Sequence, residues 1–429
     1  MTESSGNLRQ RNFKIELIAV FAILVSLGFP GNLAEIYGEQ FGTVVEYTAF
    51  FLEIFVMLFS SGKNWMDIRI VNLEKRYTIL YLFVVVIYTV SMWATRYPSL
   101  QVITCTRLVI TLFFAIWLQE RFRFERLLEL ICIAQTIFVL FTLFFIIRYP
   151  GFAFETGENF IDALQGLYNT KNTCAAELVF GAVAMAVLIH EKRKKWKEYR
   201  GWVGVWAIQI VLLLMCQATG ALFCLILVSA LFLVPSRSRM PLGWLFIAGS
   251  IIFLFATMTL MPAFEWFFEA IGKDATLTGR IPLWNQIIDV MLENNTFTGF
   301  GYGMFWRDPE AYALIHAGFE PDTFMGTMTS GGHNMLMEFW LNSGLIGLAA
   351  LFLSILYSMR KVEELPEGEY LFCFTVTGYL MINGFTERCL GGNYDYKTLI
   401  FLLVLALCCR RADEKHISEK AGKLRVSDT

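Results

Sequence analysis

The chain has 429 residues, of which 56% are hydrophobic and 40 are Phe, and this is more apolar surface than a soluble domain of that length can bury. Its 35 Lys and Arg nearly balance its 37 Asp and Glu, so the formal net charge is only −2. The composition therefore excludes a soluble globular enzyme and a strongly basic nucleic-acid-binding protein, and it indicates an integral membrane protein.

Apolar runs long enough to cross a bilayer, about 20 residues of helix, recur from one end of the chain to the other. They predict an all-α polytopic membrane protein, 1–429, with about twelve transmembrane helices in a single domain. The predicted spans are 15–30, 43–61, 78–94, 101–118, 127–148, 173–190, 202–217, 219–235, 242–262, 334–358, 370–388 and 397–410. No secretory cleavage site follows the short apolar segments, so the N-terminus is expected to stay attached.

The positive charges predict the orientation of these spans. If both termini are cytoplasmic, 26 of the 35 Lys and Arg lie on cytoplasmic segments, which is where they accumulate in membrane proteins. This orientation places a large loop, 263–333, on the extracytoplasmic face between the ninth and tenth spans. The loop holds three basic and nine acidic residues, so nucleic acid is not expected as a partner.

Charged residues also fall inside predicted spans, among them Glu46, Glu53, Arg107 and Glu177. Charges at this depth must face the interior of the helix bundle or a wet cavity. Two interpretations stay open, because such residues can fix helix packing through a buried polar network or line a substrate pathway. Lys171 lies at the outer end of the sixth span and is a candidate contact for an anion.

The nine cysteines lie mostly inside predicted spans and lack the spacing of a metal site. We expect them to be small apolar packing residues. No metal and no cofactor are predicted.

The large loop contains a segment with the pattern of a short amphipathic helix. Its apolar face is formed by Ile281, Trp284, Ile288, Met291 and Leu292, and its polar face by Asn285, Gln286, Asp289 and Glu293. Thr278 is the expected N-cap, so Gly279 and Arg280 lie where backbone N–H groups point outward and a phosphate can bind. The alternative is that Arg280 pairs with a loop acid such as Asp274.

Two further features of the loop suggest a ligand site. The glycines of Gly299-Phe-Gly301-Tyr-Gly303 favour a tight turn, with aromatic rings such as that of Tyr302 entering the membrane interface or stacking on a sugar. A dinucleotide loop is rejected because no strand–turn–helix context surrounds it. His333, in Gly331-Gly332-His333-Asn334 before the tenth span, can act as a base near neutral pH, or it can simply cap the helix.

These motifs, followed by Gly344-Leu-Ile-Gly347, resemble the O-antigen ligase and polymerase superfamily of bacterial cell-surface glycan assembly. The resemblance covers the C-terminal half in its motifs and the whole chain in its topology. Many members carry a Ser-Arg-Gly at the outer turn between spans seven and eight. Here Gln217-Ala-Thr-Gly220 occupies that turn without an arginine, which makes Lys171 a candidate substitute.

The resemblance implies a metal-independent glycosyltransferase in the bacterial cytoplasmic (inner) membrane. It would transfer a glycan from undecaprenyl diphosphate to a hydroxyl of a glycan or lipid-anchored acceptor on the extracytoplasmic face. His333 and Arg280 would be catalytic. The other expected substrate-binding residues are Lys171, Asn334, Gly279, Trp284 and Tyr302. A repeat-unit polymerase is slightly preferred to a ligase, because the acidic loop suits a phosphate-rich lipid A core poorly.

Two other classes of protein remain as alternatives. A transporter or flippase of the polysaccharide pathway would also need many spans and intramembrane charges, but it would be expected to show repeat symmetry and broken helices. A membrane scaffold explains the long polar loop least well.

Overall fold

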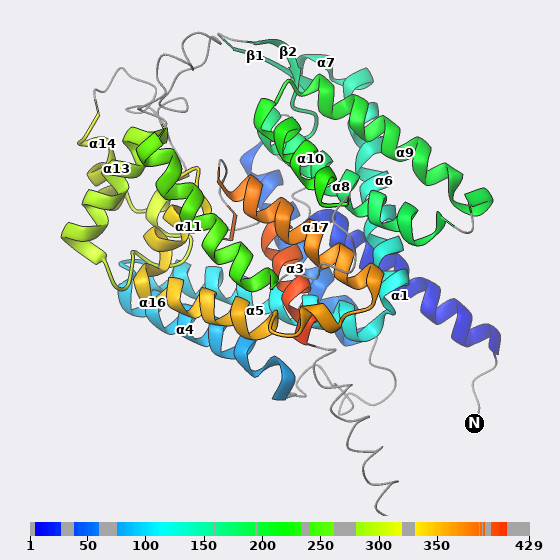
Figure 1. Ribbon diagram of the computed structural model, residues 1–429, viewed down its shortest axis with the longest axis horizontal. Helices are drawn as coiled ribbons and strands as arrows, with labels where there is room; N and C mark the ends of the chain where they lie inside the picture. Colours follow the sequence, from blue (N-terminus) through cyan, green and yellow to red (C-terminus); the bar gives the residue numbers. More distant parts are fainter. Residues whose placement is uncertain are drawn as a thin grey trace, which may run out of the picture.

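The structure is a computed structural model that describes residues 5–26, 38–59, 75–157, 160–193, 196–232, 241–260, 280–319, 331–385, 387, 389–390 and 396–409. The described residues are almost entirely helical (Figure 1). The long helices are α1 (Ser5–Ser26), α3 (Glu39–Phe59), α4 (Thr78–Ala94), α5 (Pro98–Arg121), α6 (Phe124–Arg148), α8 (Lys171–Glu191), α9 (Trp196–Met215), α10 (Thr219–Leu231), α11 (Leu242–Leu260), α16 (Met335–Ser358), α17 (Glu367–Gly384) and the last helix, Tyr396–Cys409. The only described sheet is a hairpin of β1 (Phe154–Gly157) and β2 (Phe160–Leu164), which follows the one-turn α7 (Pro150–Ala153).

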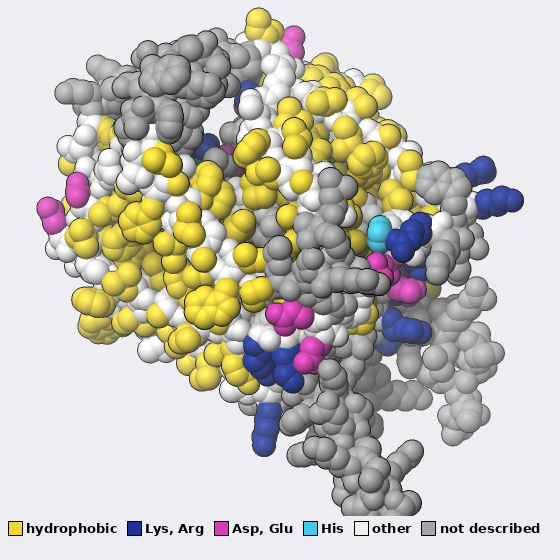
Figure 2. All heavy atoms as spheres, in the orientation of Figure 1, with side chains coloured by type: hydrophobic (Ala, Val, Ile, Leu, Met, Phe, Trp, Pro, Cys, Tyr) yellow, Lys and Arg dark blue, Asp and Glu magenta, His cyan; other side chains and the backbone are white. Residues whose placement is uncertain are grey.

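Each predicted span overlaps one of these helices. Six helical segments are long and apolar enough to cross a membrane, and four more apolar helices are shorter. Figure 2 shows apolar side chains over most of the face in view, with charged ones mainly toward its edges. The chain is therefore a polytopic helical membrane protein, and the number of twelve crossings stays a prediction.

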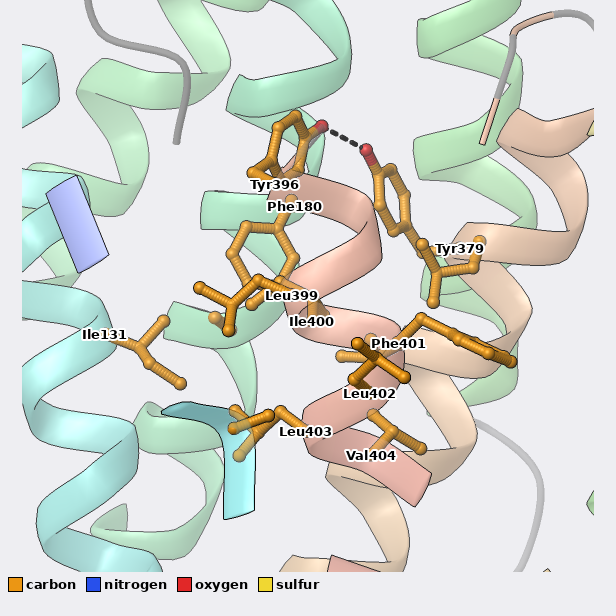
Figure 3. Packing of buried hydrophobic residues seen from close by; sticks show 14 of the residues in the cluster. Ile131, Phe180, Tyr379, Tyr396, Leu399, Ile400, Phe401, Leu402, Leu403 and Val404 are labelled. Carbon is orange, nitrogen blue, oxygen red and sulfur yellow. Dashed lines mark hydrogen bonds between the residues drawn. The ribbon is translucent and has the colours of Figure 1, made fainter. Parts of the chain in front are cut away.

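The centre of the bundle is formed by α8 and the last helix. Every residue of Tyr396–Cys409 is less than 9% exposed, and most of α8 is buried as well. Figure 3 shows Phe180 of α8 and Tyr379 of α17 packed against this helix, with a hydrogen bond of 2.5 Å between the hydroxyls of Tyr379 and Tyr396. In Figure 1 the red last helix and α17 lie in the middle, between α4 and α16 on one side and α9 and α10 on the other.

The intramembrane charges contact neighbouring helices. Glu53 accepts a hydrogen bond from Ser26 of α1 at 2.7 Å, and Glu177 accepts one from Gln135 of α6 at 2.6 Å. Arg107 lies over the rings of Tyr47 and Phe50, which belong to α3. These contacts favour the packing interpretation, while the side chain of Glu46 lies outside the described residues. The nine cysteines are all buried and form no disulfide, as expected of packing residues.

The amphipathic helix predicted within the loop 263–333 is present as α13 (Arg280–Val290), with Ile281 and Trp284 buried and the predicted polar face at least partly exposed. The prediction is wrong at Leu292, which is 61% exposed. The reason is that the helix widens to a π-turn over Met291–Asn295, so residues beyond Val290 no longer follow a period of 3.6. The predicted N-cap Thr278 and the acid Asp274 lie outside the described residues.

The glycine-rich turn folds against a break in α16. Gly344 has a φ of 63° and interrupts α16, and the turn residue Gly299 has a φ of 66°. A Cβ on Gly299 would lie 2.6 Å from the carbonyl oxygen of Leu341, and a Cβ on Gly344 would lie 2.2 Å from the backbone of Phe297. Only glycine allows this approach at either position. The turn leads to η7 (Phe305–Arg307) and α14 (Pro309–His316).

Candidate functional site

Arg280 and His333 contact the same carboxylate, that of Glu387. The Nη2 atom of Arg280 lies 3.2 Å from Oε1 of Glu387, and the Nδ1 atom of His333 lies 3.6 Å from Oε2. The three side chains come from the start of α13, the residue before the N-cap of α16 and the segment just after α17. They are 18%, 29% and 22% exposed, so the cluster is partly open to solvent. The structure thus brings the two predicted catalytic residues together through a third residue.

A further cation acts on this carboxylate. Lys397 is the second residue of the last helix and is only 7% exposed. Burial alone would raise the pKa of Glu387, but the hydrogen bond from His333 and the charges of Arg280, His333 and Lys397 outweigh burial and lower the pKa below its ordinary 4.5. Glu387 is therefore ionised at neutral pH, and its single negative charge faces at least two cations.

His333 has a backbone conformation that is unusual for its residue type. Its φ is +45°, in the left-handed region that costs free energy for any residue with a Cβ. Asn334 follows as the N-cap of α16, where its Oδ1 accepts from the N–H groups of Leu336 and Met337. The imidazole is therefore fixed at a helix start and directed at Glu387.

The other predicted substrate-binding residues lie in different surroundings. Trp284 is fully buried, and its indole N–H donates to the carbonyl of Gly332 at 2.9 Å. Tyr302 is 3% exposed, and its ring packs edge-on against Phe339 instead of reaching the membrane interface. Asn334 is 2% exposed and engaged as a cap. Contact of these side chains with a substrate stays a prediction.

The last two predicted substrate-binding residues are Gly279 and Lys171, and no described contact joins either of them to the cluster. Gly279 lies outside the described residues. Lys171 is the first residue of α8, where its backbone N–H donates to Glu155 of the hairpin at 3.0 Å. The turn of Gln217 lies beside the same hairpin, because Gln217 donates to the carbonyl of Ile161 at 2.8 Å. A site shared by Lys171, Arg280 and His333 stays a prediction.

Sequence reasoning missed Glu387 and Lys397. The predicted span 370–388 included Glu387, whereas α17 ends at Gly384 and the carboxylate lies beyond the helix. A signal was present, since Glu387 and Lys397 flank a polar break between two apolar helices on the predicted outer face. An arginine on that face needed an acidic partner, and Glu387 was one of the acids available there.

The groups in the cluster are of the kinds that can bind an anion. Within the described ranges, no group of three or more His, Cys, Asp and Glu side chains is placed to hold a metal. The cluster instead presents a guanidinium, an imidazole and the field of an ammonium around one carboxylate, and guanidinium groups bind phosphate oxygens bidentately.

The sequence is similar to known proteins over part of its length. The sequence profile of the O-antigen ligase family matches residues 202–352, which include Arg280 and His333 but not Glu387 or Lys397. The chain is also similar to the exopolysaccharide production protein ExoQ of Rhizobium meliloti (strain 1021), with 26% identity over 262 residues, 54% of this chain and 56% of the relative. The match thus spans about half of this curated relative. Together the two findings confirm the resemblance to the O-antigen ligase and polymerase superfamily.

Proposed function

We propose that this chain, a helical membrane protein with an O-antigen ligase domain, is a glycosyltransferase of extracytoplasmic polysaccharide assembly. It would transfer a glycan from undecaprenyl diphosphate to an acceptor hydroxyl at the outer face of the bacterial cytoplasmic membrane. The observation that carries the proposal is the contact of Arg280 and His333 with Glu387. Both residues of the predicted pair lie in the matched domain, and the pair combines an anion-binding group with a base.

The proposed step assigns a role to each side chain. The acceptor oxygen forms a bond to the anomeric carbon, and the bond from that carbon to the diphosphate oxygen breaks with its electron pair leaving on the diphosphate. His333 accepts the proton of the acceptor hydroxyl. Arg280, with Lys397 nearby, stabilises the charge that develops on the diphosphate. Glu387 holds Arg280 and His333 in place before the diphosphate arrives.

The acceptor is proposed to be another lipid-linked repeat unit, so that the enzyme is a polymerase. The outer loop has three basic and nine acidic residues and would repel a phosphate-rich lipid A core. The similar protein from Rhizobium meliloti is named for exopolysaccharide production, which supports the same choice.

Glycan analysis of cells that lack this protein tests the proposal. Loss of long chains with a single repeat unit retained on the acceptor supports a polymerase. Lipid-linked polymer that accumulates, with none on the anchor, shows a ligase instead. A normal glycan profile would contradict both. Complementation with the wild type and with His333→Ala, compared at equal membrane abundance, shows whether the chemistry depends on this site.

A further inference from the structure

Gly332, the residue before His333, is held through both of its backbone groups. Its N–H donates to Oε2 of Glu338 at 2.7 Å, and its carbonyl accepts from the indole N–H of Trp284 at 2.9 Å. Both partner side chains are buried, with Trp284 fully enclosed and Glu338 only 2% exposed. These hydrogen bonds are shielded from water, so they hold the backbone more firmly than exposed ones would.

Glu338 is itself fixed by other donors. The indole N–H of Trp306 lies 3.1 and 3.0 Å from its two carboxylate oxygens, and the amide of Asn342 lies 3.3 Å from Oε1. Trp306 belongs to η7 and Trp284 to α13, whereas Glu338 and Asn342 belong to α16. Gly332 is thus hydrogen-bonded both to α13, through Trp284, and to α16, through Glu338.

The two hydrogen bonds to Gly332 also constrain the backbone of the next residue, His333. The left-handed backbone of His333 is intrinsically unfavourable, so it persists only if its neighbours impose it. Asn334 fixes the following residue as a helix cap, and Trp284 and Glu338 fix the preceding one. Release of Gly332 would let the imidazole turn away from Glu387.

We propose that Trp284 and Glu338 are positioning residues that hold the His333 imidazole in its reactive orientation through Gly332. The inference rests on the proposed function of His333. It gives the outer loop a part in the site, because Trp284 reaches Gly332 from α13. It also assigns Trp284 a role that differs from the substrate contact predicted from the sequence.

Two conservative variants and a matched control test this role. Trp284→Phe keeps a ring but removes the indole N–H, and Glu338→Gln keeps the shape but replaces one acceptor oxygen by a donor. The control is Trp340→Phe, because the indole N–H of Trp340 also donates to a loop carbonyl, that of Thr296 at 3.0 Å, without contacting Gly332. If Glu338→Gln does not accumulate in the membrane, Trp284→Phe decides the question by itself.

The first measurement is hydrogen exchange at the Gly332 amide, followed by mass spectrometry on the full-length protein in nanodiscs. We expect exchange to accelerate in Trp284→Phe and Glu338→Gln and to stay as in the wild type in Trp340→Phe. Unchanged exchange in both variants would overturn the structural part of the proposal. This readout does not depend on any transfer activity.

The second measurement is transfer kinetics with lipid-linked glycan extracted from cells that lack the protein. Both variants should lower kcat of the folded enzyme about tenfold, less than the roughly hundredfold loss expected when a reacting group moves by about 1 Å, while the KM for the donor stays close to that of the wild type. A raised KM with normal kcat would instead show that Trp284 contacts the substrate, and would overturn the proposal.

The His333→Ala variant distinguishes a failure of the positioning proposal from a failure of the proposed function. Wild-type kcat in both variants, with His333→Ala inactive, rejects the positioning role and leaves the proposed function intact. Full activity of His333→Ala rejects the catalytic role of the histidine, and the positioning proposal falls with it.

Discussion

Two clusters of charged residues in this protein have opposite balances of charge. The first lies where α1, α6 and α8 meet, and there Arg126 contacts two carboxylates, Glu16 at 2.7 Å and Glu129 at 2.8 Å. Lys192 pairs with Glu125 beside them at 2.8 Å. In this first cluster the acids outnumber the bases among the contacts described, and every cation has a carboxylate within ion-pair distance.

The second cluster has the reverse composition. Among the described residues, the carboxylate of Glu387 faces Arg280, His333 and the nearby Lys397. In the first cluster each cation is paired with a carboxylate without any ligand, and the ion pairs connect neighbouring helices. In the second, the basic side chains outnumber the acidic ones among the described residues, and we propose that this arrangement favours a diphosphate leaving group. If the second cluster is a binding site, as proposed, the balance of charge and not the presence of ion pairs distinguishes it from the structural cluster.

The largest effect is expected for His333→Ala, which removes the proposed base. Glycan transfer should be abolished while membrane insertion and abundance stay normal, because the side chain lies at the partly open cluster and not in the packed core. The measurement is the glycan-length ladder of complemented cells. An unchanged ladder from a normally abundant variant would remove the catalytic role.

Arg280→Ala should be nearly as damaging, and Arg280→Lys should recover only part of the activity. A lysine supplies a point charge, whereas a guanidinium can bind two oxygens of a diphosphate at once. Transfer rates with extracted lipid-linked donor measure both variants. Full activity of the lysine variant would show that charge alone matters, and full activity of the alanine variant would contradict an anion site.

A smaller loss is expected for Lys397→Met, which keeps most of the buried stem and removes the charge. The donor should bind about tenfold more weakly, through a higher KM, because one of the cations near the diphosphate is lost. Lys171→Met is the informative comparison, since the sequence predicted Lys171 as the second cation. If only Lys171→Met raises KM, the second phosphate contact belongs to Lys171 and not to Lys397.

The predictability of the fold differs from that of the site for a physical reason. A span in lipid must be apolar along its own length, so the local sequence predicts it, and each predicted span overlaps a helix. The helical period of α13 can likewise be read from the sequence up to Val290. Glu387 was missed because a length criterion extended its span past Gly384. Contacts between distant segments, such as Trp284 with Gly332, depend on tertiary packing that no local pattern encodes.

The charge cluster of α1, α6 and α8 should respond differently. Arg126→Met should lower Tm by a few degrees, because Glu16 and Glu129 lose their shared partner, but it should leave the transfer rate of the remaining folded protein unchanged. Thermal unfolding and donor kinetics on the same preparation measure both quantities. A selective loss of kcat at normal Tm would contradict the purely structural role of this cluster.

The smallest effect concerns the pH dependence of stability at Glu387. Because the folded-state pKa of this carboxyl is lowered below 4.5, its interactions stabilise the fold above that ordinary value, and the stabilisation is lost as pH falls through the lowered pKa. Glu387→Gln should therefore lower Tm by about 2 °C near pH 7, and the difference from the wild type should vanish well below pH 4.5. Thermal unfolding of both proteins across this range gives the measurement. A difference that stays constant into the acid range would mean that packing of the side chain, and not its charge facing Arg280, His333 and Lys397, accounts for the stability.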